Sequence, residues 1–91
     1  MTPPTAAEVL EVVRSAVVTV LEVDPAVVQP GTRLREDLEA DSLGLVEIVE
    51  IVEERLAERV PGFHVEDEEL DGLTTVDDAV DLAVRRLSGA G

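Results

Sequence analysis

The chain has 91 residues and a formal net charge of -14, with 21 acidic residues against 7 basic ones, no Cys, and one Phe as its only aromatic residue. This length supports one small core, so we expect a single domain over residues 1–91, and its charge argues against nucleic acid or anionic membranes as partners and favours basic proteins. Without Cys there is no disulfide, thiol nucleophile or Cys-based metal site, and no apolar run approaches the roughly 18 residues of a membrane span.

The first residues, Met1-Thr2-Pro3-Pro4, lack the basic region and apolar core of a secretory signal, so we expect a cytoplasmic protein. We also expect a monomer. A first helix is predicted from about Thr5 to Leu21 or Glu22. It begins with the capping-box sequence Thr5-Ala6-Ala7-Glu8. Apolar residues then recur at helical spacing: Ala6, Val9, Leu10, Val13, Val17, Val20 and Leu21.

A long connection follows, because Asp24-Pro25 breaks the helical pattern and Pro30-Gly31 interrupts it again. Loops as long as residues 23–41 are usually functional or disordered. Spaced apolar residues favour an ordered loop that packs on the helices through Val27, Val28, Leu34 and Leu38.

The second helix is predicted from Asp41 or Ser42 to near Arg59, with two distinct faces. One face is apolar: Leu45, Ile48, Val49, Val52 and Leu56. The opposite face is acidic: Glu47, Glu50, Glu53 and Glu54. Leu43 and Val46 fall on the acidic side, where a purely solvated surface has no need of them.

Pro61-Gly62 ends this helix, and Phe63 and Val65 are expected to tuck under the bundle. Residues 66–70 predict one short helical turn. Thr75-Val76-Asp77-Asp78 then starts a last helix, whose final residues, 88–91, are expected to fray. The fold class is therefore all-α: a four-helix bundle of three long helices and one short helix, with a long ordered loop between the first two.

Few residues are suited to catalysis. The only His is His64, in the link after the second helix, and a lone His there is far more often a surface or packing residue than a general base. The many carboxylates lie on exposed helix faces and lack the spacing of an EF-hand loop. We therefore expect neither an enzyme nor a specific metal site.

Ser42 differs from the other two Ser residues, because Ser15 lies inside a helix and Ser88 lies in the tail. At the first turn of a helix, free backbone N–H groups and the helix dipole favour a phosphate group. The alternative is that Asp41 or Ser42 is merely an N-cap, which is a common role for both residue types.

The sequence around Ser42 resembles the acyl carrier protein family. Leu38-Glu39-Ala40-Asp41-Ser42-Leu43 is similar to the family's Asp-Ser-Leu attachment motif with its leader. The resemblance continues through the acidic second helix and returns in Thr74-Thr75-Val76. Together with the capped first helix, it covers nearly the whole chain.

This resemblance implies that Ser42 carries covalent 4′-phosphopantetheine, installed from coenzyme A by a magnesium-dependent phosphopantetheinyl transferase. The arm would carry acyl groups as thioesters in fatty-acid or polyketide biosynthesis, and Asp41 and Leu43 would flank the attachment point. The family's recognition helix, which binds basic surfaces of acyl-transferring and condensing enzymes, matches Leu43, Val46, Glu47, Glu50, Glu53 and Glu54. Gly44 and Glu50 depart from the usual pattern, which often has a polar or bulkier residue and an apolar residue there.

Two other functions stay open. A peptidyl (aminoacyl) carrier of a peptide synthetase ranks lower, because such carriers more often have Gly-rich leaders and less acidic helices. An unmodified acidic helical adaptor would bind a basic partner through its second helix. Modification by a transferase separates both carriers from the adaptor.

Overall fold

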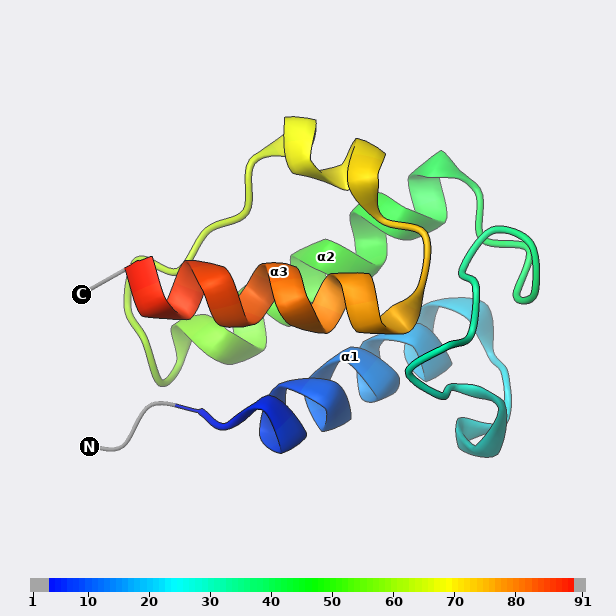
Figure 1. Ribbon diagram of the computed structural model, residues 1–91, viewed down its shortest axis with the longest axis horizontal. Helices are drawn as coiled ribbons and strands as arrows, with labels where there is room; N and C mark the ends of the chain where they lie inside the picture. Colours follow the sequence, from blue (N-terminus) through cyan, green and yellow to red (C-terminus); the bar gives the residue numbers. More distant parts are fainter. Residues whose placement is uncertain (1–3, 90–91) are drawn as a thin grey trace.

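A computed structural model describes residues 4–89 and contains three α-helices and two short 3-10 helices (Figure 1). In chain order they are α1 (Ala6–Leu21), η1 (Pro25–Val27), α2 (Ser42–Ala57), η2 (Asp67–Gly72) and α3 (Val76–Gly89). The helix α1 packs against both α2 and α3, and η2 packs against α2. The expected all-α bundle is confirmed, with its short helix formed as a 3-10 helix. None of the described helices is long and apolar enough to cross a lipid bilayer.

The predicted capping box starts α1. The N–H of Glu8 donates to Oγ1 of Thr5 at 3.2 Å, and the N–H of Thr5 donates back to Oε1 of Glu8 at 3.2 Å. The last helical residue is Leu21, and Glu22 is the C-cap. Glu22 adopts the left-handed conformation with φ 54° and donates its N–H to the carbonyl of Val18. Both ends therefore lie within a residue of the predicted positions.

The connection between α1 and α2 is ordered, as expected, although its anchors differ in part. Val28 is fully buried, Leu34 is 1% exposed and Leu38 is half-buried. Val27, also predicted as an anchor, is 46% exposed. The reason is the unpredicted turn η1, where the Asp24 side chain accepts the N–H of Ala26 and turns Val28 inward in place of Val27.

Backbone hydrogen bonds fasten this connection to the start of α3. The N–H of Leu34 donates to the carbonyl of Thr74 at 2.9 Å, and the N–H of Val76 donates to the carbonyl of Thr32 at 2.9 Å. An isolated antiparallel bridge joins Arg33 to Thr75 between them. The loop before α2 is thus held by a segment about forty residues further along the chain.

The core is almost entirely aliphatic. Its largest fully buried side chains come from all three α-helices and the first connection: Val9, Val13, Val17, Val28, Leu34, Leu45, Leu56 and Val76. Phe63 and Val65 are 6% and 5% exposed, so the expectation that they tuck under the bundle is confirmed. Among the described residues no polar or charged side chain is buried, which places every ionised group at or near solvent.

The helix ends differ slightly from the predictions. The helix α2 ends at Ala57, short of Arg59, with Glu58 as its C-cap. Ser88 and Gly89, which were expected to fray, belong to α3. The predictions for Met1, Thr2 and Pro3 and for Ala90 and Gly91 fall on residues outside the described range.

Candidate functional site

Asp41 and Ser42 form the start of α2, and only Asp41 acts as the cap. Asp41 has extended backbone, with φ -89° and ψ -179°, and its Oδ1 accepts the N–H of Gly44 at 2.7 Å. Ser42 is the first helical residue and is exposed. Its hydroxyl makes no hydrogen bond within the described part of the chain. The alternative that Ser42 serves as the N-cap is therefore wrong, because Asp41 fills that role.

Gly44 explains how the cap fits so closely. A Cβ atom at this position would lie 3.2 Å from Oδ1 of Asp41 and 3.7 Å from Cδ2 of Leu21. The first of these contacts is tighter than a side chain normally tolerates, so the missing side chain leaves room for the Asp41 carboxylate. Gly44 thereby lets the cap approach the helix, at a cost in helix propensity of about 1 kcal/mol relative to Ala.

The two residues before Asp41 set the direction in which the chain enters α2. Glu39 adopts the left-handed conformation with φ 57°, a region that residues with a Cβ rarely occupy. Ala40 is 4% exposed and donates its N–H to the carbonyl of Leu34 at 2.9 Å. Because Leu34 is itself bonded to Thr74, Ser42 is held in a fixed position relative to α3.

The outward face of α2 presents one apolar residue among acids. Leu43 is 66% exposed, an unusual exposure for a large apolar side chain, and Val46 is half-buried. Glu47, Glu50 and Glu54 are exposed. The structure therefore places these five predicted recognition residues on one accessible surface that begins beside Ser42.

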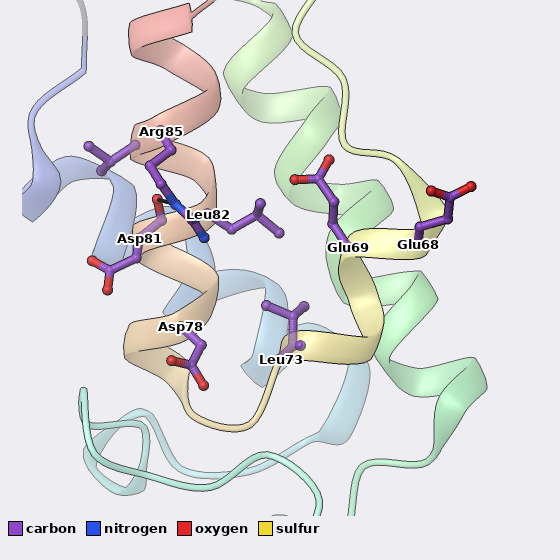
Figure 2. Close-up of a pocket in the computed structure, with 9 residues that line it drawn as sticks. Glu68, Glu69, Leu73, Asp78, Asp81, Leu82 and Arg85 are labelled. Carbon is purple, nitrogen blue, oxygen red and sulfur yellow. Dashed lines mark hydrogen bonds between the residues drawn. The ribbon is translucent and has the colours of Figure 1, made fainter.

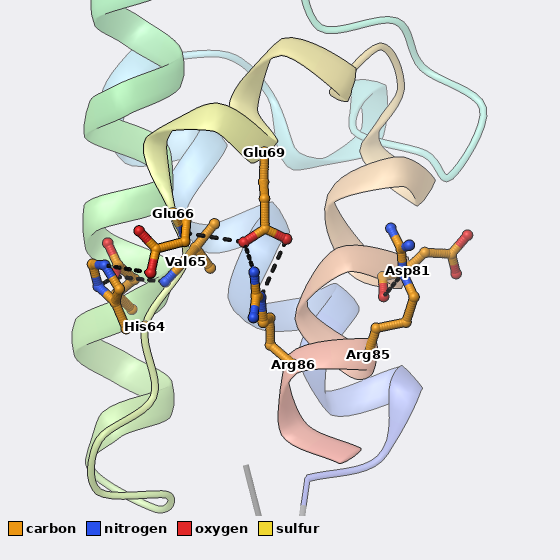
Figure 3. A network of polar contacts seen from close by, with 8 residues as sticks. His64, Val65, Glu66, Glu69, Asp81, Arg85 and Arg86 are labelled. Carbon is orange, nitrogen blue, oxygen red and sulfur yellow. Dashed lines mark hydrogen bonds and ion pairs between the residues drawn. The ribbon is translucent and has the colours of Figure 1, made fainter. Parts of the chain in front are cut away.

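Glu53, the sixth predicted recognition residue, also has a structural role that the sequence did not reveal. Its Oε2 accepts the N–H of Val65 at 3.0 Å and lies 2.7 Å from Nδ1 of His64. Its side chain is only 21% exposed. Figure 3 shows His64 and Val65 on the link that runs beside α2. Glu53 thus ties this link to the helix, and His64 is an exposed residue of that contact.

A surface groove of about 420 Å³ adjoins Ser42. It lies between α2, η2 and the first connection. The lining residues are Arg35, Ser42, Leu45, Val46, Glu50, Leu70 and Asp71. A bulky group on the Ser42 hydroxyl would therefore find space beside the helix without displacing the core.

A larger groove, of about 620 Å³, separates η2 from α3. Figure 2 shows Glu68 and Glu69 on one side of it and Asp78, Asp81 and Arg85 on the other. The carboxyl of Glu69 pairs with Arg86 (Figure 3), and this guanidinium holds the pKa of Glu69 below its ordinary value.

Asp78, on the α3 side of this groove, is a capping residue. Its Oδ2 accepts the N–H groups of Thr75 and Thr74, and these bonds lower the pKa of its carboxyl. Asp78 and Glu69 therefore stay ionised near neutral pH and serve the fold. Within residues 4–89 no group of His and acidic side chains is arranged to hold a metal ion.

Among the described residues, Ser42 has no partner that would activate its hydroxyl for nucleophilic attack. Such activation requires a base within hydrogen-bond reach. His64 contacts Glu53, which lies eleven residues along α2 from Ser42, or about 16 Å at 1.5 Å per residue. His64 is therefore too far from Ser42 to act as its base.

Comparisons with known proteins agree with this geometry. Residues 11–83 match the family described as the phosphopantetheine attachment site. An acyl carrier protein from Rubrobacter xylanophilus is 42% identical over 77 residues, covering 85% of this chain and 89% of the relative. One from Thermosynechococcus vestitus is 41% identical over 75 residues, covering 82% and 86%, and one from Helicobacter hepaticus is 41% identical over 73 residues, covering 80% and 90%. The chain therefore belongs to the acyl carrier protein family, whose members bear a phosphopantetheine group and act as carriers, not as enzymes.

Proposed function

We propose that Ser42 is the attachment residue for 4′-phosphopantetheine and that the chain carries acyl groups as thioesters on this arm, in fatty-acid or polyketide biosynthesis. The observation that carries the proposal is the exposed Ser42 hydroxyl at the first residue of α2, which makes no hydrogen bond to any described residue. It lies within the 11–83 segment that matches the family. Because Asp41 caps the helix, the Ser42 oxygen is available for a covalent bond.

The residues around Ser42 fit the group. A phosphodiester at the first turn of α2 would meet the positive end of the helix dipole. The adjoining groove of about 420 Å³ gives the arm a surface to follow. When bound, the group supplies a thiol for thioester chemistry, and the chain itself has no Cys to offer one.

The outward face of α2 is the proposed docking surface for the transferase and for acyl-transferring and condensing enzymes. Leu43 supplies an exposed apolar contact, and Glu47, Glu50 and Glu54 surround it with negative charge. Complementary charge speeds encounter and orients the partner more than it tightens the complex. The partners are therefore expected to present basic surfaces with an apolar recess.

Incubation with coenzyme A, magnesium and a phosphopantetheinyl transferase tests the proposal. Intact mass should rise by one phosphopantetheine in the wild type and stay unchanged in Ser42→Ala. The exposed Ser88 provides a matched control, since Ser88→Ala should load like the wild type. A modified Ser42→Ala protein would refute the assignment of the site. A wild type that several transferases leave unmodified would favour the acidic adaptor.

A further inference from the structure

The groove beside Ser42 is lined by a cation, Arg35, as well as by acidic and apolar residues. Its walls come from three separate segments. Ser42, Val46 and Glu50 line it from α2, Leu70 and Asp71 line it from η2, and Arg35 lines it from the first connection. Since the proposed attachment residue forms part of its lining, a group bound to Ser42 lies at the groove from the moment it is attached.

Arg35 is the one Arg without a hydrogen bond or ion pair in the described part of the chain. The other Arg side chains each contact a carboxylate, a carbonyl or a hydroxyl: Arg14, Arg33, Arg55, Arg59, Arg85 and Arg86. Glu36 and Asp37, the nearest acids in sequence, pair with Arg33 instead. An exposed, unpaired guanidinium is therefore available for an anion that does not belong to the protein.

The backbone places Arg35 at the Ser42 end of the groove. The carbonyl of its neighbour Leu34 accepts the N–H of Ala40 at 2.9 Å, and Ala40 lies two residues before Ser42. Glu50 lies eight residues beyond Ser42, or about 12 Å along the helix at 1.5 Å per residue. The groove thus has a cation near Ser42 and an acid further along α2.

Resting on the proposed attachment at Ser42, we propose that Arg35 binds the phosphodiester of the arm and holds its base in this groove. A guanidinium matches a phosphate in both charge and geometry. The half-buried Val46 and Leu70 line the groove as apolar surface. Glu50 and Asp71 repel further anions, so a neutral arm and cargo are favoured over a cargo that ends in a carboxylate.

Phosphorus and proton NMR of the loaded protein test this contact. The samples are loaded wild type, Arg35→Gln and Arg35→Lys, with Arg55→Gln as a control that makes the same change in net charge on an exposed residue of α2. The wild type should show contacts from arm protons to the methyl groups of Val46 and Leu70 at low salt. In Arg35→Gln the phosphorus shift should move toward that of the same loaded protein unfolded in urea, where the phosphodiester is undocked. The ratio of docked to free arm should fall by about 1.5- to 5-fold, the effect of one exposed charge pair.

Three further comparisons sharpen the test. Arg35→Lys should restore part of the docked population, Arg55→Gln should match the wild type, and high salt should bring the wild type to the level of Arg35→Gln. A neutral acyl cargo and a dicarboxylic cargo of equal length should show the same dependence on Arg35. An effect confined to the dicarboxylic cargo would assign Arg35 to the cargo and overturn the proposal.

Identical phosphorus shifts and arm contacts in wild type and Arg35→Gln would also overturn the proposal while leaving the attachment at Ser42 intact. Failure of the attachment itself would be seen separately, as a protein whose intact mass does not change on incubation with the transferase.

Discussion

At the scale of single residues, Asp41 and Ser42 have separate roles at the start of α2. The Asp41 carboxylate accepts the N–H of Gly44 and caps the start of α2. The Ser42 hydroxyl is therefore not needed as a cap and is exposed. Removing an N-cap side chain typically costs about 1 kcal/mol. The helix end is therefore stable while the proposed attachment oxygen of Ser42 remains free.

Glu39 offers a test of backbone strain beside the site. With φ 57° it lies in the left-handed region, which costs a residue with a Cβ roughly 1–2 kcal/mol, whereas Gly loses about 0.5–1 kcal/mol more chain entropy on folding. Glu39→Gly is therefore expected to raise the free energy of unfolding by about 0.5–1 kcal/mol, measured by urea titration. Glu39→Ala removes the same charge but keeps the strain, so it should not produce this gain. An equal gain in both variants would assign the effect to charge.

At the scale of elements, α2 has a buried face, the proposed docking face, and the Glu53 contact that ties the following link to the helix. Glu47 is exposed on the outward face, so Glu47→Lys is expected to slow transfer by partner enzymes several-fold at low salt and leave the circular dichroism spectrum native. Asp81→Lys, the same charge change on an exposed residue of α3, is the control and should slow transfer less. Equal slowing by both variants would indicate a general charge effect without a specific docking face.

Substitution of Glu53 should lower stability, whereas substitution of Glu47 should slow transfer and leave the fold intact. Glu53→Lys removes the acceptor of the Val65 N–H, so the free energy of unfolding should fall by about 1 kcal/mol or more. Glu53→Gln retains an acceptor and should recover part of that loss. Stability of Glu53→Lys equal to that of the wild type would show that the link does not depend on this contact.

The stability that Asp78 contributes at the start of α3 should depend on pH. The pKa of Asp78 is lowered from 3.8 by the N–H groups of Thr75 and Thr74, so ionised Asp78 favours the folded state. This contribution is fully present above about pH 4 and is lost as pH falls through the lowered pKa. The free energy of unfolding of Asp78→Ala should be lower than that of the wild type by about 1 kcal/mol at neutral pH.

Denaturant titrations from pH 7 to pH 2 check this difference. The gap between wild type and Asp78→Ala should stay constant down to about pH 4 and then narrow. Asp81→Ala removes the same charge from an exposed position. Its free energy of unfolding should equal that of the wild type across this pH range. A gap that is independent of pH would mean that the carboxylate charge is not what stabilises the cap.

At the scale of the whole molecule, the core contains a small apolar cavity that bears on the cargo. The cavity has a volume of about 20 Å³ and is lined on α2 by Leu45, Ile48, Val49 and Val52. Val76 is fully buried but does not contribute to this lining. Room for about one water molecule means that an acyl chain can enter only if the helices move apart.

A medium-length acyl chain on the arm is predicted to enter this cavity and widen it. Each methylene buried should stabilise the domain by about 0.8 kcal/mol, less the cost of separating the helices. Methyl NMR shifts at Leu45, Val49 and Val52 should then grow with chain length, while those of the exposed Val27 stay constant. Changes confined to residues around Ser42 at every chain length would show that the chain lies on the surface.

Much of the fold and part of the site were predictable from sequence because they depend on local pattern. Apolar residues at helical spacing predicted all three α-helices, and the Thr5-Glu8 and Thr75-Asp78 pairs predicted two of their starts. The residues from Leu38 to Leu43 pointed to Ser42 as the candidate attachment residue through their resemblance to a family motif. These features depend on residues a few positions apart in the sequence. Such residues are neighbours in the local structure whatever the tertiary fold.

Only the tertiary structure decided which residues from distant segments meet. It placed Glu53 against Val65, fastened the first connection to the start of α3, and set Arg35 in the groove beside Ser42. It also turned Val27 outward and Val28 inward, against the predicted anchors. No periodicity encodes these contacts, because each depends on where the chain returns after a turn and on which side chains then fill the space between helices.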